Sequence, residues 1–225
     1  MWNGEKGRVE ERSVRIPFDG ITLEADLALP SNAKGVVLFA HGSGSSRFSR
    51  RNQAVARKLQ GAGFATLLLD LLTAQEEKAE ARTAHFRFDI EMLSLRLAAA
   101  TEWAVAQRDL EGLPVGYFGA STGAAAAIVA AAMLPDIVAA VVSRGGRPDL
   151  AGSALPGVRA PTLLIVGGSD TVVIDLNQTA MRHMHARTEL VIVPGAGHLF
   201  EEPGALERVA TLASEGFTLY LKGEA

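Results

Sequence analysis

The feature that most constrains this chain is a short turn that joins an apolar strand to an alanine-rich helix. Residues 114–135, PVGYFGASTGAAAAIVAAAMLP, hold an apolar run that stops at GASTG, and the alanine-rich run follows at once. So sharp a turn predicts a strained backbone at Ser121 and lifts its hydroxyl clear of the chain, as a nucleophile requires. Strand and helix then approach so closely that only the glycines at 119 and 123 fit on either side. The G-x-S-x-G pattern is weak alone, and its strand–helix context makes it informative.

Composition limits the class of protein. A chain of 225 residues suits a single α/β domain over residues 1–225, and a hydrophobic content of 48% is typical of a packed globular enzyme. The net charge of −3 lacks the excess of positive charge that is typical of proteins that bind nucleic acid. The chain has no cysteine, which excludes disulfides, thiolate metal sites and a cysteine nucleophile.

The first residues, MWNGEKGRVEERS, carry charges where an export signal needs an apolar core, and no apolar run reaches membrane length. We therefore expect a cytoplasmic protein with no membrane partner, although a lack of cysteine is also compatible with export. The apolar C-terminal helix could serve the core or an interface, so a homo-oligomer stays open.

Hydrophobic patterning predicts a sheet covered by helices on both faces. Two antiparallel strands are expected at 8–17 and 21–29, where apolar and polar residues alternate around a turn. Six buried strands are expected at 35–40, 64–70, 115–118, 137–142, 162–166 and 190–193, and helices at 49–60 (closed by Gly61), 88–107, after residue 121, at 172–184 and at 204–221. The alternation predicts a doubly wound, mostly parallel α/β sheet without a cap domain, its site at the carboxyl ends of the strands.

The charged stretch within residues 71–88 allows two interpretations. It could be a solvated helix or loop, or a mobile flap beside the active site, because functional loops gather where strands end.

A serine hydroxyl needs a base to remove its proton, and that base is normally a histidine oriented by a carboxylate. Among five histidines, His198 lies in the loop PGAGHLFEE after a strand, where glycines leave its ring free to approach Ser121. Asp170 closes VGGSD after another buried strand and is the expected orienting acid, with Asp175 as its rival one helical turn further on and Glu201 and Glu202 as weaker alternatives. The order Ser121, Asp170, His198 is that of α/β-hydrolases.

Attack on a carbonyl also needs preplaced donors for the developing oxyanion. We expect one to be the N–H of Thr122 at the head of the helix, and the other the N–H of Ser43 in the loop HGSGSSR. His41 is expected to shape that loop. The loop lacks the lysine of a P-loop and the spacing of a dinucleotide fingerprint, which argues against nucleotide binding.

The segments FAHGSGSSR, LLLDLLT, GYFGASTG, VVSRGGRPDL, TLLIVGGSD and GHLFEEPGAL resemble the dienelactone hydrolase-like branch of the α/β-hydrolase superfamily nearly end to end. The resemblance implies Ser121 as nucleophile with Asp170 and His198 as partners, no cofactor and no metal. It also implies that such domains are sometimes fused to a phosphoribosyltransferase domain. Dienelactone hydrolases use cysteine in G-x-C-x-G, whereas position 121 here is serine.

Three arginines are candidates for substrate binding. Arg144 and Arg147 flank two glycines after a strand, and Arg47 ends the glycine-rich loop. Each could form a structural ion pair with Asp149 or another nearby carboxylate. Alternatively, one of them receives a substrate carboxylate or phosphate, which a guanidinium grips with two hydrogen bonds.

The sequence favours a serine hydrolase that cleaves a small carboxylic ester or lactone through an acyl-enzyme. The same residues could transfer the acyl group to another acceptor or cleave a thioester. From a different class, the chain could be a non-catalytic binding or partner domain that retains the fold.

Overall fold

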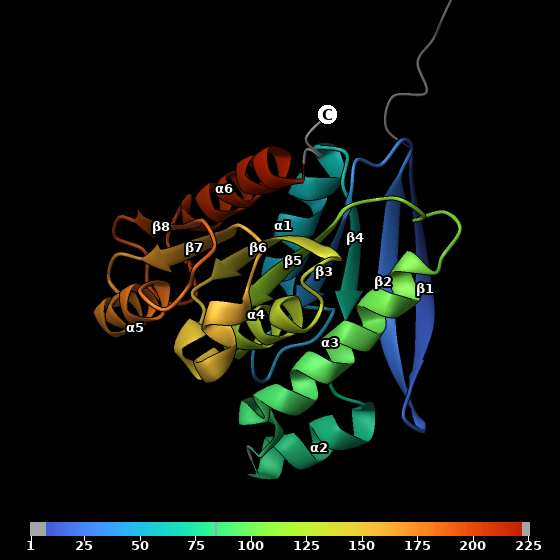
Figure 1. Cartoon of the computed structure of the whole chain (residues 1–225), viewed down its shortest axis with the longest axis horizontal. Helices are drawn as coiled ribbons and strands as arrows, with labels where there is room; N and C mark the ends of the chain where they lie inside the picture. The colour runs from blue at the N-terminus through green and yellow to red at the C-terminus, as the bar shows by residue number, and fades with distance from the viewer. Residues whose placement is uncertain (1–7, 84, 222–225) are drawn as a thin grey trace, which may run out of the picture.

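The computed structural model describes residues 8–83 and 85–221, which form an eight-stranded sheet with helices on both faces (Figure 1). The strands lie in the order β1-β2-β4-β3-β5-β6-β7-β8. Their bounds are β1 Val9–Phe18, β2 Ile21–Pro30, β3 Val36–Ala40, β4 Ala65–Leu69, β5 Val115–Ala120, β6 Val138–Arg144, β7 Thr162–Gly167 and β8 Thr188–Val193.

The sheet is mixed, and its antiparallel part is N-terminal as predicted. β1 pairs antiparallel with β2, β2 pairs antiparallel with β4, and the pairings from β4 to β8 are all parallel. Asp19 and Gly20 both have positive φ at the hairpin between β1 and β2, as a tight two-residue hairpin turn requires. Parallel strands end at the same edge of a sheet, so the loops after β3 to β8 meet there.

Helices cover the sheet in two layers. Their bounds are α1 Arg50–Gly61, α2 Ala74–Thr83, α3 Ile90–Val105, α4 Thr122–Met133, α5 Thr171–Met181 and α6 Ala205–Tyr220, with short 3₁₀ helices η1 Phe86–Phe88 and η2 Pro148–Gly157. α1 and α6 contribute to the hydrophobic cluster on one face, and α3, α4 and α5 to the cluster on the other. Figure 1 shows α1 and α6 together, apart from α3 and α4.

Strand β5 shows how a fully buried strand serves both layers. Tyr117 packs into the α3–α4 cluster and Phe118 into the α1–α6 cluster, because successive side chains point to opposite faces. The Tyr117 hydroxyl lies 2.6 Å from that of Thr101 on α3, which satisfies both buried groups. Gly116 leaves room for Phe217, whose ring would lie 2.7 Å from a Cβ at this position.

Four expectations about local structure need correction. Strand β6 continues through Ser143 and Arg144, expected in a loop, because these residues pair with the end of β5. β8 is half exposed rather than buried, since it forms the edge of the sheet. The helix η2 was not expected. The positive φ after α1 falls at Gly63, not at Gly61.

The described part of the stretch 71–88 is mainly helical, and a role as a flap beside the active site stays a prediction. Arg96 on α3 donates two hydrogen bonds of 2.7 and 2.6 Å to the Glu76 carboxylate on α2, and a third of 2.7 Å to the Leu71 carbonyl. These contacts tie α2 to α3 beside the carboxyl end of β4.

Residues 1–7 lie outside the described residues. They belong to the charged N-terminal stretch that argues against an export signal. Among the helices within 8–83 and 85–221, none has the length and apolar character needed to cross a membrane.

Candidate active site

Ser121 lies at the apex of the turn between β5 and α4, with φ 51° and ψ −123°. This strained conformation is the one that the sequence predicted for a raised nucleophile. A Cβ at Gly119 would lie 2.4 Å from Cα of Ala124, and one at Gly123 would lie 2.2 Å from the carbonyl oxygen of Ala40. Glycine is therefore required at both positions by direct steric contact with backbone.

The backbone of Ser121 is joined to the loop after β6. Its N–H donates to the Arg144 carbonyl at 3.3 Å, and its carbonyl accepts from the Arg147 N–H at 3.1 Å. Between these residues, Gly145 faces the histidine loop, and a Cβ there would lie 3.6 Å from Cε1 of His198. The segment 144–147 thus contacts both the turn at Ser121 (the serine turn) and the loop after β8 that carries His198 (the histidine loop).

Asp170 and His198 meet at the ends of β7 and β8. The Asp170 carboxylate lies 2.7 Å from Nδ1 of His198, with the two side chains 17% and 39% exposed. Asp170 is the N-cap residue of α5, whereas the rival Asp175 is exposed on that helix. An acid that accepts the Nδ1 proton leaves Nε2 of a neutral imidazole free to accept another proton.

The Ser121 hydroxyl makes no hydrogen bond within the residues that the structure describes, so its contact with His198 remains a prediction. Catalytic hydrogen bonds are often long in ligand-free enzymes and shorten when substrate binds.

The loop after β3 lies directly against the serine turn. A Cβ at Gly42 would be 3.0 Å from Cβ of Ser121, which is tight enough to favour glycine at this position. The hydroxyls of Ser43 and Thr122 lie 3.1 Å apart. Across the described parts of the chain, the backbone N–H groups of these two residues donate no hydrogen bond.

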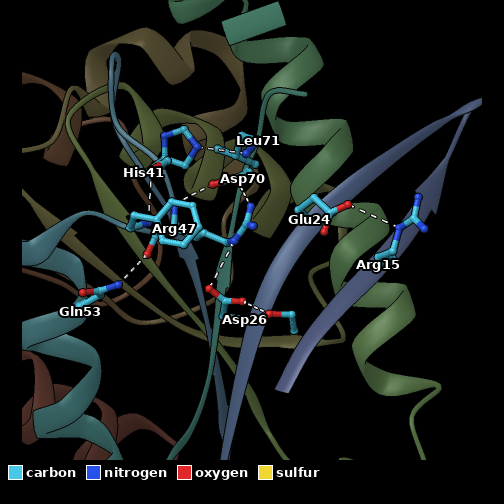
Figure 2. A network of polar contacts seen from close by, with 11 residues as sticks. Arg15, Glu24, Asp26, His41, Arg47, Gln53, Asp70 and Leu71 are labelled. Carbon is cyan, nitrogen blue, oxygen red and sulfur yellow. Dashed lines mark hydrogen bonds and ion pairs between the residues drawn. The ribbon is translucent and has the colours of Figure 1, made fainter. Parts of the chain in front are cut away.

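Two of the three candidate arginines are paired with carboxylates. Arg147 donates from Nε and Nη2 to Asp149 at 2.8 and 2.7 Å. Arg47 forms an ion pair with Asp70, and its Nε lies 3.3 Å from Oδ2 of Asp26 (Figure 2). The structural interpretation therefore accounts for Arg47 and Arg147.

Arg144 differs from the other two. It is 7% exposed, its guanidinium has no hydrogen bond or ion pair to any described residue, and its Nε is fully enclosed. The guanidinium lies over the ring of Phe200, 5.9 Å from its centroid. Burial lowers the pKa of Arg144 to about 10, with the charge of Arg51 acting in the same direction, so the group stays charged at neutral pH.

Sequence reasoning missed two residues that support these loops. Asp70 directly follows β4 and holds Arg47, and its position after a buried strand was the same signal that pointed to Asp170. Asn177 is buried on α5 and donates to the carbonyls of Gly146 and Val173 at 3.0 and 2.8 Å. No local pattern distinguishes Asn177 from a solvated helix residue.

A small cavity of about 10 Å³ lies beside the serine turn. Ser43, Thr122, Leu72 and Leu93 are among its lining residues, and α2 contributes Glu77. Within 8–83 and 85–221, no three histidine, aspartate or glutamate side chains are grouped so that they could hold a metal ion.

The chain is similar to proteins of known name over nearly its whole length. A crystal structure of a dienelactone hydrolase from Anabaena variabilis is 57% identical and superposes with a TM-score of 0.93, covering 95% of this chain and 99% of that one. Est1E from Butyrivibrio proteoclasticus shares the fold, with 20% identity and a TM-score of 0.75 over 92% of this chain and 97% of that one.

A Mycobacterium tuberculosis protein that bears the provisional name of a phosphoribosyl transferase is 54% identical over 215 residues, which are 96% of this chain and 48% of that protein. The chain therefore spans about half the length of this curated relative. The model of the dienelactone hydrolase family matches residues 23–220. The eight-stranded α/β sheet also matches the Anabaena structure. This chain therefore belongs to the dienelactone hydrolase family.

Proposed function

We propose that this protein is a serine hydrolase that cleaves a small carboxylic ester or lactone through an acyl-enzyme. One observation carries the proposal: Asp170 and His198 form a carboxylate–imidazole pair at 2.7 Å, and the segment 144–147 contacts both the loop of His198 and the strained turn that presents Ser121. Both come from loops at the carboxyl edge of the sheet, where α/β folds place their ligands.

In the acylation step, Nε2 of His198 removes the proton of Ser121 as Oγ attacks the substrate carbonyl. The developing oxyanion is stabilised by the N–H groups of Ser43 and Thr122, which have no acceptor among the described residues. Asp170 stabilises the imidazolium. When the intermediate collapses, the carbonyl–oxygen bond of the ester breaks and the imidazolium gives its proton to the leaving alkoxide.

In the deacylation step, water takes the place of the leaving group. His198 removes a proton from water, the hydroxide attacks the acyl carbonyl, and the bond to Oγ of Ser121 breaks as Oγ regains a proton. An ester yields an acid and an alcohol, whereas a lactone yields one hydroxy acid because its leaving group stays attached.

The name of one relative supports hydrolysis over the alternatives: the Anabaena protein, 57% identical to this chain, is called a dienelactone hydrolase. Acyl transfer to another acceptor and thioester cleavage would use the same residues. A non-catalytic domain is the alternative from another class, and free N–H groups beside a strained serine argue against it.

A fluorophosphonate probe followed by a substrate screen tests the proposal. We expect the probe to label Ser121 and the protein to hydrolyse activated esters of short acids. Added alcohols or thiols that capture most of the acyl group would favour the transferase, and faster cleavage of thioesters than of matched esters would favour the thioesterase. A protein left unlabelled across neutral and mildly alkaline pH would favour the non-catalytic domain.

Arg144 completes the proposal as the group that receives an anion on the substrate. A buried charge without a partner is costly, and the described residues offer this guanidinium no carboxylate. It lies on the segment that contacts both Ser121 and His198, so a carboxylate or phosphate held there would belong to the substrate or its leaving group.

Replacing Arg144 by methionine should therefore lower kcat/KM for a carboxylated ester by about 10–100-fold, the effect of one charged hydrogen bond. Hydrolysis of the matched neutral ester should change much less. Arg147→Met is the control, because its guanidinium already pairs with Asp149 and should affect both esters equally. Equal losses on both esters in Arg144→Met would exclude this role.

A further inference from the structure

His41 is buried at the end of β3 and has two hydrogen-bond partners of opposite kind. Its Nε2 lies 3.0 Å from the Leu71 N–H, and its Nδ1 lies 2.9 Å from the Gly42 carbonyl oxygen. An N–H can only donate and a carbonyl can only accept, so the ring is neutral with its proton on Nδ1. Burial lowers the pKa of His41, and the bond to Gly42 and the charge of Asp70 only partly oppose this.

The bond to Gly42 has a geometric consequence for the next residue. The Gly42 carbonyl and the Ser43 N–H belong to one planar trans peptide, so they point in opposite directions. While His41 holds the carbonyl on its own side, the N–H must face away from the ring. That N–H has no acceptor among the described residues.

Without such a hold, this peptide would have unusual freedom. Gly42 has no Cβ to restrict its ψ, and Gly44 just beyond adopts a positive φ of 64°. A Cβ at position 42 would lie 3.0 Å from both the Ala120 carbonyl oxygen and Cβ of Ser121, a tight contact that favours glycine. Close packing therefore favours a flexible residue at position 42, although the direction of the Ser43 N–H depends on this peptide.

We propose that His41 is a positioning residue for the oxyanion hole: its Nδ1–H holds the Gly42 carbonyl and thereby aims the Ser43 N–H at the developing negative charge. The inference rests on the proposed serine-hydrolase function and adds to it a residue that never touches the substrate.

The other end of the loop is anchored separately. Asp70 accepts from the Arg47 N–H at 2.6 Å and from the Arg47 guanidinium, while its neighbour Leu71 donates to His41 (Figure 2). Two adjacent residues at the end of β4 thus hold both ends of the loop 41–47. Because Arg47 stays anchored by Asp70, a change at His41 can release the Gly42 peptide without releasing the loop.

Two substitutions separate the two hydrogen bonds. In His41→Asn the side-chain amide can replace Nδ1–H toward Gly42 but cannot reach Leu71. In His41→Gln the side-chain oxygen can replace Nε2 toward Leu71 but leaves the Gly42 carbonyl unheld. We expect His41→Gln to lower kcat for an activated ester at least tenfold with KM within about threefold, and His41→Asn to retain most of kcat. His183→Gln, at an exposed histidine, is the matched control.

The opposite order, or equal losses in both variants, would overturn the positioning role, as would a rise in KM with kcat preserved. A wild-type protein that neither hydrolyses esters nor reacts with a fluorophosphonate would overturn the proposed function itself, and this role with it. Nitrogen-15 NMR of the wild-type ring gives a test that needs no variant to fold: we expect a protonated Nδ1 and a bare Nε2. The reverse tautomer would overturn the inference whatever the activity.

Discussion

Ser121→Ala should lower the rate of ester hydrolysis by about 10⁶-fold. Without the nucleophile, His198 and Asp170 have no hydroxyl to activate, so losing Ser121 costs about as much as losing all three residues. The fold should not change, since alanine differs only by the hydroxyl, and that hydroxyl makes no hydrogen bond to any described residue. Steady-state rates with an activated ester, together with loss of fluorophosphonate labelling, would measure the effect.

Ser153→Ala is the matched control for this experiment. Ser153 is exposed in η2, so its loss should leave the rate unchanged. Retention of more than a tenth of the activity in Ser121→Ala would mean that another residue is the nucleophile.

Asp170→Asn should lower kcat by about 10³–10⁴-fold while the protein remains folded. The carboxylate accepts the Nδ1 proton of His198 at 2.7 Å and so keeps Nε2 bare for the serine proton. An amide in its place can donate to Nδ1, which would move the proton to Nε2 and remove the base. Measurement of kcat, with circular dichroism to confirm folding, tests this.

The rival acid supplies the control. Asp175 is exposed on α5, and Asp175→Asn should leave kcat within about twofold of the wild type, the usual outcome of a surface change. If the two substitutions had equal effects, or if Asp175→Asn were the more damaging, the assignment of Asp170 as the orienting acid would be wrong.

Local sterics explain why the serine turn could be predicted. The strain at Ser121 and the need for glycine at 119 and 123 depend on a strand and a helix that are adjacent in sequence. The hairpin at Asp19 and Gly20 is predictable for the same reason. The end of β6 and the exposure of β8 were predicted wrongly because they depend on which strand lies alongside.

The arginines mark the limit of sequence reasoning most clearly. Arg47, Arg144 and Arg147 all follow strands and glycines, and any of them could have been paired or free. Arg147 has its carboxylate two residues away, whereas the partner of Arg47 comes from the end of β4. That Arg144 has no partner among the described residues depends on every element packed around it.

The sequence alone determined the family, the strand–helix order and the strained serine, because each depends on residue type and on neighbours in the chain. Only the tertiary structure decided between Asp170 and Asp175 as the acid that meets His198, brought Asp70 to Arg47, and left Arg144 without a partner among the described residues. Such contacts join residues far apart in the chain, and they follow from strand order and register, which are properties of the assembled sheet rather than of any one segment.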